Sequence, residues 1–453
     1  MGPTGARGER PRPVGYPFGL CLHAALAALI ALLVPAPAQA QADPAAFGPF
    51  EDRPVTAVDI EGNRTTRAYV ITRELETAAG QPFHLATLQA DLQRLENLGL
   101  FAETTVEPSA DADGVRLLLH VHEMPPLLVY PSFIYTEENG FAYGGGLSAM
   151  NLTGRGINLS ARAYFGGSTQ RWARLVHPWI AGNHLSFEFF GGERDRADVL
   201  NGFEEDSWEF TPKVGTWLGR HGRLQGSLSL FRMRSDVDGK TLDPDNEDQL
   251  VRVGGSIGWD TRDSWREPRH GWKNEIELVR SAGAGSFWTV NLDVRRYQPT
   301  GPRRYLLLSG LLTHQTGTVG EDVPVYLTYY LGGANSIRGY AIEELGPKLN
   351  GKNQLLTTAE HSFNLLPLGR RDFFKWSFSL GLDLALFADA GIAWSESPDL
   401  QWNRIRGGGG VGLRLLVPGS EQVRFDLGWS EGGGLQFHFA SGTKPASQRQ
   451  RLR

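Results

Sequence analysis

Apolar and polar side chains alternate with a period of two residues over most of this chain, from residue 127 to residue 440. Helical spacing disappears in this tract, and clusters of Gly, Asn, Asp and Pro separate the alternating runs. The clearest runs begin at Leu159, Leu224, Val290 and Val423. This pattern is typical of β-strands that have one apolar face. Each run is close to the roughly ten residues that a tilted strand needs to cross a bilayer.

Two architectures use strands of this kind. A soluble sandwich turns the apolar face inward, whereas a membrane barrel turns it to lipid and its polar face to a lumen. Charged residues recur between the apolar positions of many runs, and a single sandwich of this length would be unusual. Closure into a barrel also removes exposed strand edges. At about 20 residues per strand and connection, the tract predicts a mainly β fold, a transmembrane barrel of about 16 strands.

The composition excludes several functions. Glycine contributes 56 residues and aromatic side chains 10%, which suits a β protein with many turns. A net charge of −5 without a long basic run argues against a nucleic-acid surface. The chain has no HExxH pattern, no Gly-x-Ser-x-Gly elbow and no phosphate loop, so an enzyme is the poorest fit. We expect no catalytic residues, cofactors or metal site.

Residues 1–40 predict a secretory signal peptide. Arginines precede an apolar run at residues 20–34, and small residues at 38–40 provide a cleavage site. An uncleaved membrane anchor is the alternative, although the apolar run is short for a span. Removing this segment also removes the single cysteine, Cys21. The mature chain then relies on packing and backbone pairing rather than on disulfides.

Residues 54–123 predict one small α+β domain in the order βααββ. Thr65 or Thr66 is expected to cap the first helix. The second helix has leucines at spacings of three and four residues from Leu85 to Leu98, and Gly99 ends it. A hairpin with its turn at residues 113–114 completes the domain. Its small size favours interaction over catalysis.

The segment around Asp389 predicts a charge that faces the lumen. Alternation puts the leucines from Leu382 to Leu386 on one face, and Phe387 and Asp389 on the other. If the leucines face lipid, Asp389 needs water or a cation, because an unpaired buried charge is costly. Arg338, in the loop sequence LGGANSIRGY, is a candidate partner, since its guanidinium can bind a carboxylate through two hydrogen bonds.

Four features of the chain, in this order, resemble the outer-membrane assembly-factor superfamily, which includes BamA, TamA and the transporters of two-partner secretion. Members combine periplasmic POTRA domains of βααββ form with a 16-stranded barrel. The matching residues are an upstream hairpin motif (Asp260, Arg262, Asp263, Pro268, Gly271), a loop signature (Gly332, Gly333, Arg338, Gly339, Tyr340), a barrel-wall motif (Phe387, Asp389, Gly391) and a terminal strand signal (Gly434, Phe437, Phe439). A late strand at residues 410–417, followed by a turn at 418–419, also resembles the family.

The resemblance implies a single POTRA domain at residues 54–123, a barrel at 127–440 and a basic tail at 441–453. It also implies that the Arg-Gly-Tyr loop folds into the lumen, where Asp389 holds Arg338. The chain departs from the family pattern in having one POTRA domain, where relatives usually carry several. The tail is the second departure, and we expect a disordered periplasmic segment rather than a docking segment.

By this resemblance, the protein is an outer-membrane barrel of a Gram-negative bacterium that inserts or translocates client proteins. The POTRA domain would capture unfolded clients in the periplasm by β-augmentation. The expected partners are the outer-membrane lipid bilayer, unfolded outer-membrane or secreted proteins, and a periplasmic or inner-membrane partner. A passive channel or structural barrel and a lipid-transport barrel of the same fold stay open as alternatives.

Overall fold

The computed structural model describes residues 44–111, 113–136, 139–182, 184–265, 267–346, 348–373, 376–416 and 422–441. The predicted signal peptide, the predicted turn at residues 418–419 and the predicted tail beyond Ser441 lie outside these residues. The described chain is mainly β, which confirms the predicted fold class. None of its helices is both long enough and apolar enough to cross a membrane.

The N-terminal domain has the predicted βααββ order. A short helix α2 (Pro44–Phe47) and a 3-10 turn η1 (Gly48–Phe50) precede its five elements, which are β1 (Val55–Glu61), α3 (Ala68–Thr72), α4 (Leu85–Asn97), β2 (Phe101–Asp111) and β3 (Gly114–Glu123). β3 lies in the middle of the sheet, parallel to β1 and antiparallel to β2. Leu88 and Leu95 of α4 are buried with Leu117 and Leu119 of β3, so the predicted leucine face forms the core.

The prediction that Thr65 or Thr66 caps the first helix is wrong. Arg67 occupies the N-cap position of α3 and makes no side-chain capping bond. The Thr66 hydroxyl instead donates to Glu123 Oε1 at 2.5 Å, and the same carboxylate accepts the backbone N–H groups of both threonines. The end of β3 therefore anchors the segment before α3.

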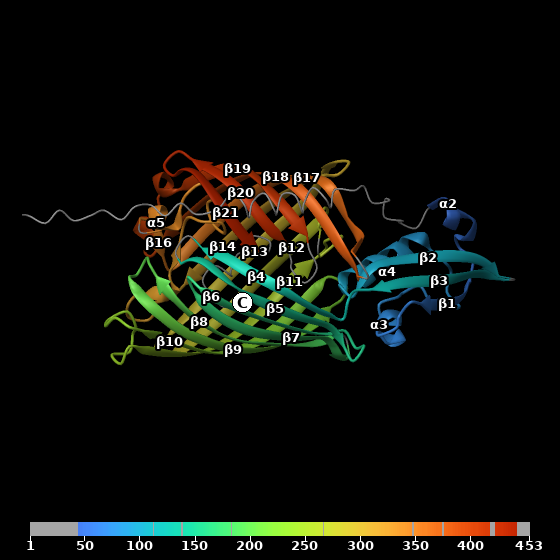
Figure 1. Cartoon of the computed structure of the whole chain (residues 1–453), viewed down its shortest axis with the longest axis horizontal. Helices are drawn as coiled ribbons and strands as arrows, with labels where there is room; N and C mark the ends of the chain where they lie inside the picture. The colour runs from blue at the N-terminus through green and yellow to red at the C-terminus, as the bar shows by residue number, and fades with distance from the viewer. Residues whose placement is uncertain are drawn as a thin grey trace, which may run out of the picture. The chain divides into compact units, whose positions relative to one another are not determined.

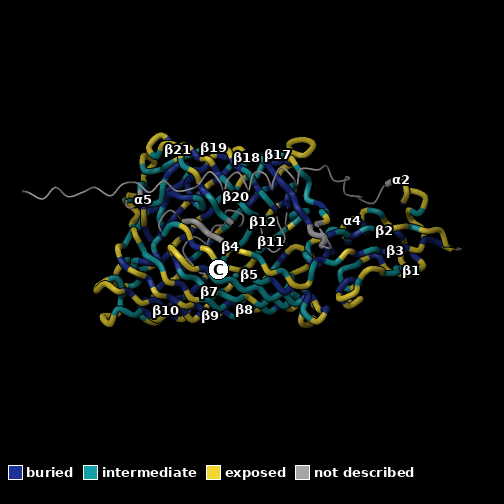
Figure 2. Tube along the Cα trace, viewed as in Figure 1, coloured by how far each residue is buried: buried dark blue, intermediate teal, exposed yellow. Residues whose placement is uncertain are grey.

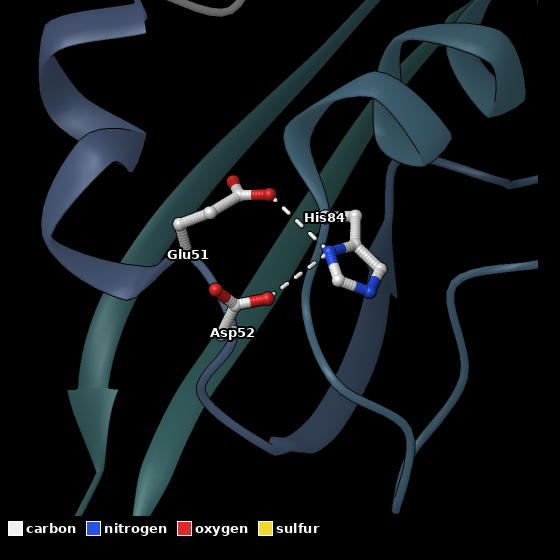
Figure 3. A group of neighbouring side chains, drawn as sticks. All are labelled: Glu51, Asp52 and His84. Carbon is white, nitrogen blue, oxygen red and sulfur yellow. Dashed lines mark hydrogen bonds and ion pairs between the residues drawn. The ribbon is translucent and has the colours of Figure 1, made fainter.

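Three exposed side chains meet at the start of α4 (Figure 3). Oxygen atoms of Glu51 and Asp52 lie 3.3 and 3.5 Å from His84 Nδ1, which gives a group with the residue types of a metal site. The second oxygen of Glu51 accepts the N–H of Leu85 at 3.1 Å. A carboxylate in this position satisfies an open N–H group of the helix and its dipole. Capping of α4 therefore accounts for Glu51 without a ligand.

After the N-terminal domain, the main sheet has 16 strands, antiparallel between neighbours, and curls into the predicted barrel (Figure 1). In sheet order from the N-terminal end, the strands are β4 (Leu127–Thr136), β5 (Gly140–Leu152), β6 (Ile157–Gly166), β7 (Thr169–Ala181), β8 (Leu185–Asp198), β9 (Phe203–Leu218), β10 (Gly222–Ser235), β11 (Glu247–Asp260), β12 (Gly271–Gly283), β13 (Phe287–Gly301), β14 (Arg304–Gln315), β17 (Asn353–Phe373), β18 (Trp376–Trp394), β19 (Arg406–Leu416), β20 (Val423–Ser430) and β21 (Gly434–Ser441).

The first and last strands, β4 and β21, approach each other to Cα distances within 8 Å. Among the residues that the structure describes, no backbone ladder joins these two strands. Among the described residues, the β4–β21 seam is therefore the one place where adjacent barrel strands approach each other without a strand ladder.

The wall has its apolar face outside and its polar face inside, the reverse of a soluble sandwich. On β11, Val251 and Val253 are 44% and 57% exposed, whereas Arg252 between them is 4% exposed. Figure 2 shows buried and exposed stretches side by side along the wall, with mostly exposed loops at its ends. An exposed apolar face and a buried polar face suit a wall between lipid and a filled lumen.

A long loop joins β14 to β17. It contains η2 (Val325–Leu327), β15 (Tyr329–Tyr330), α5 (Ile342–Leu345) and β16 (Asn350–Gly351), and β15 pairs with β16. Its residues Leu331, Ile337 and Tyr340 are buried in one cluster with Leu356 of β17 and Ala393 of β18. The loop therefore packs on the inner side of the wall through apolar contacts. Two 3-10 turns, η3 (Ser397–Asp399) and η4 (Trp402–Arg404), connect β18 to β19.

Candidate functional site

Two glycines shape the segment that carries the Arg-Gly-Tyr sequence. Gly332 and Gly333 have φ angles of 111° and 79°, a region that other residues rarely adopt. The Gly333 N–H donates to Tyr340 O at 2.8 Å and closes the segment on itself. A Cβ atom on Gly332 would lie 2.7 Å from Ala341 O, so this position also needs the space. The turn presents Arg338 at its tip.

Arg338 binds Asp389 through its side chain and its backbone. Its Nε and Nη2 atoms donate to the two carboxylate oxygens of Asp389 at 2.8 and 3.1 Å, and its backbone N–H donates at 3.1 Å. Thr358, directly opposite Asp389 on β17, donates its hydroxyl to the same carboxylate at 2.8 Å. Arg338 is 0% exposed. The structure thus brings together the two residues that the sequence proposed as partners.

Two further carboxylates and two further arginines surround this pair. Arg338 Nη1 lies 3.1 Å from Glu360 Oε2 and 3.3 Å from Asp426 Oδ2. Arg414 bridges the same two acids, with donor distances of 2.6 Å to each. Arg424, on the strand of Asp426, lies 3.7 Å from it and donates to loop atoms Ala334 O and Asn335 Oδ1. The six groups form a charge-balanced cluster.

Burial makes the members of this cluster depend on one another. Burial alone would lower the pKa of Arg338, but the carboxylates of Asp389, Glu360 and Asp426 outweigh it and raise the pKa above the usual arginine value. Arg338 therefore stays charged at every physiological pH. Removing one member of a buried ion cluster leaves an uncompensated charge, which is far more costly than losing an exposed pair.

The other residues of the wall motif complete the contact with the loop. The guanidinium carbon of Arg338 lies 3.4 Å from the centre of the Phe387 ring, a cation–π contact. Gly391 leaves room on the inner face, because a Cβ atom there would lie 2.5 Å from the Leu356 side chain and 3.5 Å from Ile337. Phe387, Asp389 and Gly391 thus face the loop from one side of β18.

The upstream hairpin motif is far from this cluster in the sheet and forms the turn from β11 to β12. Asp260 accepts two hydrogen bonds from the Arg262 guanidinium, at 2.9 and 2.6 Å. Asp263 accepts the backbone N–H groups of residues 264, 269 and 270. Gly271 has a φ of 110°, and a Cβ atom there would lie 2.1 Å from Thr261 O. The motif residues therefore build the turn, and Pro268 is buried within it.

The same turn carries a buried acid that the sequence reading missed. Glu267 accepts a hydrogen bond from Asn364 Nδ2 on β17 at 2.8 Å and pairs with Arg269. The same Asn364 nitrogen donates to Asp383 on β18 at 2.7 Å, and Tyr305 of β14 donates to Asp383 at 3.0 Å. The turn is therefore bonded to β17, and Asn364 and Asp383 connect it to a hydrogen-bond network that includes β18 and β14. The β17 ladder is irregular from Asn364 to residue 369, at this contact.

We expect the attachment of this turn to weaken as the pH rises. Burial raises the pKa of Glu267 from 4.5 to about 7, with Asp383 adding to the rise and Arg269 opposing it. The folded state therefore keeps the Glu267 proton longer than the unfolded chain does. The stability contribution of this group is complete below about pH 4.5 and is lost as the pH rises to about 7.

Amide hydrogen exchange in residues 261–270, measured between pH 5 and pH 8 and corrected for the intrinsic rate, tests this expectation. Protection should fall across the interval in the wild type, and Glu267→Gln should remove most of the pH dependence because the amide does not titrate. The matched control is Glu275→Gln on β12, outside the turn. An unchanged pH profile in Glu267→Gln would contradict the assignment of the titration to Glu267.

The terminal strand signal lies at its predicted place on β21. Gly434 begins the strand with a φ of 70°. Phe437 is exposed on the lipid-facing side, and Phe439 packs beside Phe425 of β20, with ring centres 5.2 Å apart. These residues lie apart from the buried charge cluster, so the four sequence motifs form three separate sites: the loop and wall together, the upstream turn, and β21.

Comparisons with protein families cover both parts of the chain. A model of the Omp85 superfamily domain matches residues 151–444, and a model of the POTRA domain, described as surface antigen variable number repeat, matches residues 54–124. The wall motif, the loop signature and the upstream turn all fall within the first match.

Two curated relatives are outer membrane protein assembly factors named BamA. The protein from Nitratidesulfovibrio vulgaris is 25% identical over 395 residues, which are 83% of this chain and 48% of that protein. The protein from Neisseria meningitidis serogroup B is 22% identical over 453 residues, which cover 88% of this chain and 55% of that protein. The chain therefore spans about half the length of the curated relatives it matches.

Solved structures share the fold. BamA from Haemophilus ducreyi lacking POTRA domains 1–3 superposes with a TM-score of 0.55 at 15% identity, covering 86% of this chain and 83% of that one. CdiB from Escherichia coli gives a TM-score of 0.55 at 16% identity, covering 86% of this chain and 74% of that one. At these identities the likeness concerns architecture alone.

Proposed function

The chain belongs to the Omp85 superfamily, and from this premise we propose that it inserts or translocates client proteins. It is an outer-membrane protein of a Gram-negative bacterium, with its POTRA domain in the periplasm. The relatives named BamA are assembly factors by name, and proteins of the same fold include CdiB. Clients would be unfolded outer-membrane or secreted proteins.

The β4–β21 seam is the observation that carries this proposal. A strand edge offers unpaired N–H and C=O groups, and an incoming client strand can pair with them. No ladder closes β4 to β21 in the described residues, so opening this seam separates no described strand ladder, whereas opening any other pair of neighbouring barrel strands does. A passive channel would need no such edge, which favours client handling over the channel alternative.

The POTRA domain supplies the capture step in this proposal. Its sheet has the order β1-β3-β2, so β1 and β2 each have one side without a strand neighbour in the sheet. An extended client segment could add to such an edge by backbone hydrogen bonds, with little demand on its sequence. The Arg338 cluster would hold the loop against the inner wall while clients pass.

Depletion of the protein tests the proposal in cells. We expect the abundance of a set of outer-membrane or secreted proteins to fall several-fold in quantitative proteomics, and plasmid-borne wild-type protein to restore it. Unchanged abundance of all such proteins would contradict client handling.

Purified protein in vesicles should then protect an added unfolded barrel client from protease. Ion conductance without client protection would support a passive channel, and lipid exchange without it would support lipid transport.

A further inference from the structure

The loop tip is bonded directly to the last strand of the barrel. The backbone N–H of Gly339, the residue after Arg338, donates to Nε2 of His438 on β21 at 3.1 Å. The C=O of the same glycine accepts the hydroxyl of Ser430 at the end of β20. His438 is 2% exposed. The backbone of one loop residue, Gly339, is therefore held by both of the final two strands.

The hydrogen bond from the Gly339 N–H defines which nitrogen of His438 carries a proton. A backbone N–H can only donate, so Nε2 must offer its lone pair. The imidazole is then neutral and carries its proton on Nδ1. Its cross-strand partner on β20 is Asp426, a member of the buried charge cluster. His438 thus lies between that cluster and the β4–β21 seam.

The glycine turn before β21 fits closely around the same loop residues. A Cβ atom on Gly433 would lie 2.3 Å from Gly339 O and 2.8 Å from the Tyr340 ring. A Cβ atom on Gly432 would lie 3.2 Å from the same ring. The Gly433 N–H also donates to the Ser430 hydroxyl at 3.0 Å. The turn is therefore shaped by the loop tip and is more than a flexible connection.

We propose that His438 is a positioning residue that ties the loop tip to β21, so that release of the loop and opening of the seam are coupled. On one side β21 has the β20 ladder, and on the seam side no ladder is present among the described residues. The loop adds a third restraint, because Arg338 is anchored on β18 and Gly339 on β21. Movement of β21 away from the wall must break the His438 bond or carry the loop with it. That the coupling matters for client proteins rests on the proposed function.

Hydrogen exchange of the full chain in nanodiscs tests the tie without a client. His438→Phe keeps a ring but removes the acceptor, whereas His438→Gln keeps an acceptor oxygen. We expect His438→Phe to raise exchange about fivefold, the change given by one net hydrogen bond, in both residues 434–441 and residues 331–341. His438→Gln should lie closer to the wild type. Gln436→Leu is the matched control, because its side chain bonds within its own hairpin, to Gly433 O.

A second variant keeps the test valid if His438→Phe fails to assemble. Gly433→Ala leaves His438 in place but brings a methyl group against Gly339 O, and it should raise exchange in the same two segments. In an Arg338→Ala background, where the loop is already released, His438→Phe should add little. Unchanged exchange in either segment, or full additivity with Arg338→Ala, would overturn the coupling.

The proposed client handling and the proposed tie between His438 and the loop can each fail without the other. If the exchange results are as expected but depletion leaves client abundance unchanged, the tie stands and the proposed function fails. If depletion lowers client abundance while both His438→Phe and Gly433→Ala exchange like the wild type, the function stands and the tie fails.

Discussion

Arg338→Ala should leave the barrel assembled but release the loop and remove most of the activity. The substitution leaves Asp389 buried without its bidentate partner and also removes a cation from Glu360 and Asp426. Breaking a buried ion cluster in this way costs about 3–5 kcal/mol. Complementation of a depleted strain would measure activity, and the heat-dependent mobility shift of folded barrels in gels would measure assembly.

The matched control is Arg171→Ala. Arg171 and Glu193 form an ion pair at 2.5 Å on the same barrel, but their side chains are 57% and 52% exposed. An exposed pair contributes about 0–1 kcal/mol, so this variant should behave like the wild type. Wild-type complementation by Arg338→Ala would contradict the role of the cluster, because the two substitutions would then be equivalent despite opposite burial.

Charge reversal is expected to rescue Arg338→Asp only slightly. A simple pair would regain function when Asp389→Arg is added. In the structure, however, an aspartate at position 338 would face two other carboxylates, Glu360 and Asp426. Arg338→Lys keeps the charge but loses the planar fork that binds both oxygens of Asp389, so it should retain more function than the reversed pair. Full rescue by reversal would mean that the pair acts independently of its neighbours.

The wall and its main ion pair could be predicted because they depend on local patterns. Alternation fixes which side chains of a strand share a face. Since the leucines of this strand are expected to face lipid, Phe387 and Asp389 are expected to face the lumen, whatever the position of the strand in the sheet. Arg338 was a candidate partner because its guanidinium can bind a carboxylate through two hydrogen bonds, and the loop signature supported it by resemblance. Prediction of the first helix cap failed because the competing acceptor, Glu123, is far away in the sequence.

The rest of the cluster depends on strand register, which local patterns do not contain. Glu360 lies two residues after Thr358 and therefore shares the inner face of β17 with it. Glu360 comes close to Arg338 only because Thr358 pairs across the sheet with Asp389, which binds Arg338. Arg414 and Asp426 come from two more strands, and Glu267 reaches β17 through a turn that crosses two intervening strands. The alternation of side chains along each strand could have predicted that these charges face the lumen. Which charges pair with one another could not be predicted without the register between the strands.

Gly408→Val should displace the loop as fully as Arg338→Ala, although it removes no charge. The four-glycine run at residues 407–410 lies in β19. A Cβ atom on Gly408 would lie 2.1 Å from Arg338 O, a backbone atom that cannot rotate away. On β20, a Cβ atom on Gly428 would lie 2.5 Å from Gly339 N. Gly408 and Gly428, on neighbouring strands, therefore leave the space in which the backbone of the loop tip packs against the wall.

Gly407→Ala is the control for this substitution, because a Cβ atom there has its nearest contact at 3.4 Å, from Asp389 O. Both variants remove a glycine from the same strand, so a difference between them reports the loop and not the strand. Gly408→Val should open residues 331–341 to protease and lower complementation as Arg338→Ala does, and Gly407→Ala should do neither. The double variant with Arg338→Ala should be no worse than either single change, since both act by releasing the same tip. A protected loop in Gly408→Val would show that the tip tolerates a side chain at this position, and the charge cluster alone would then be enough to hold the loop against the wall.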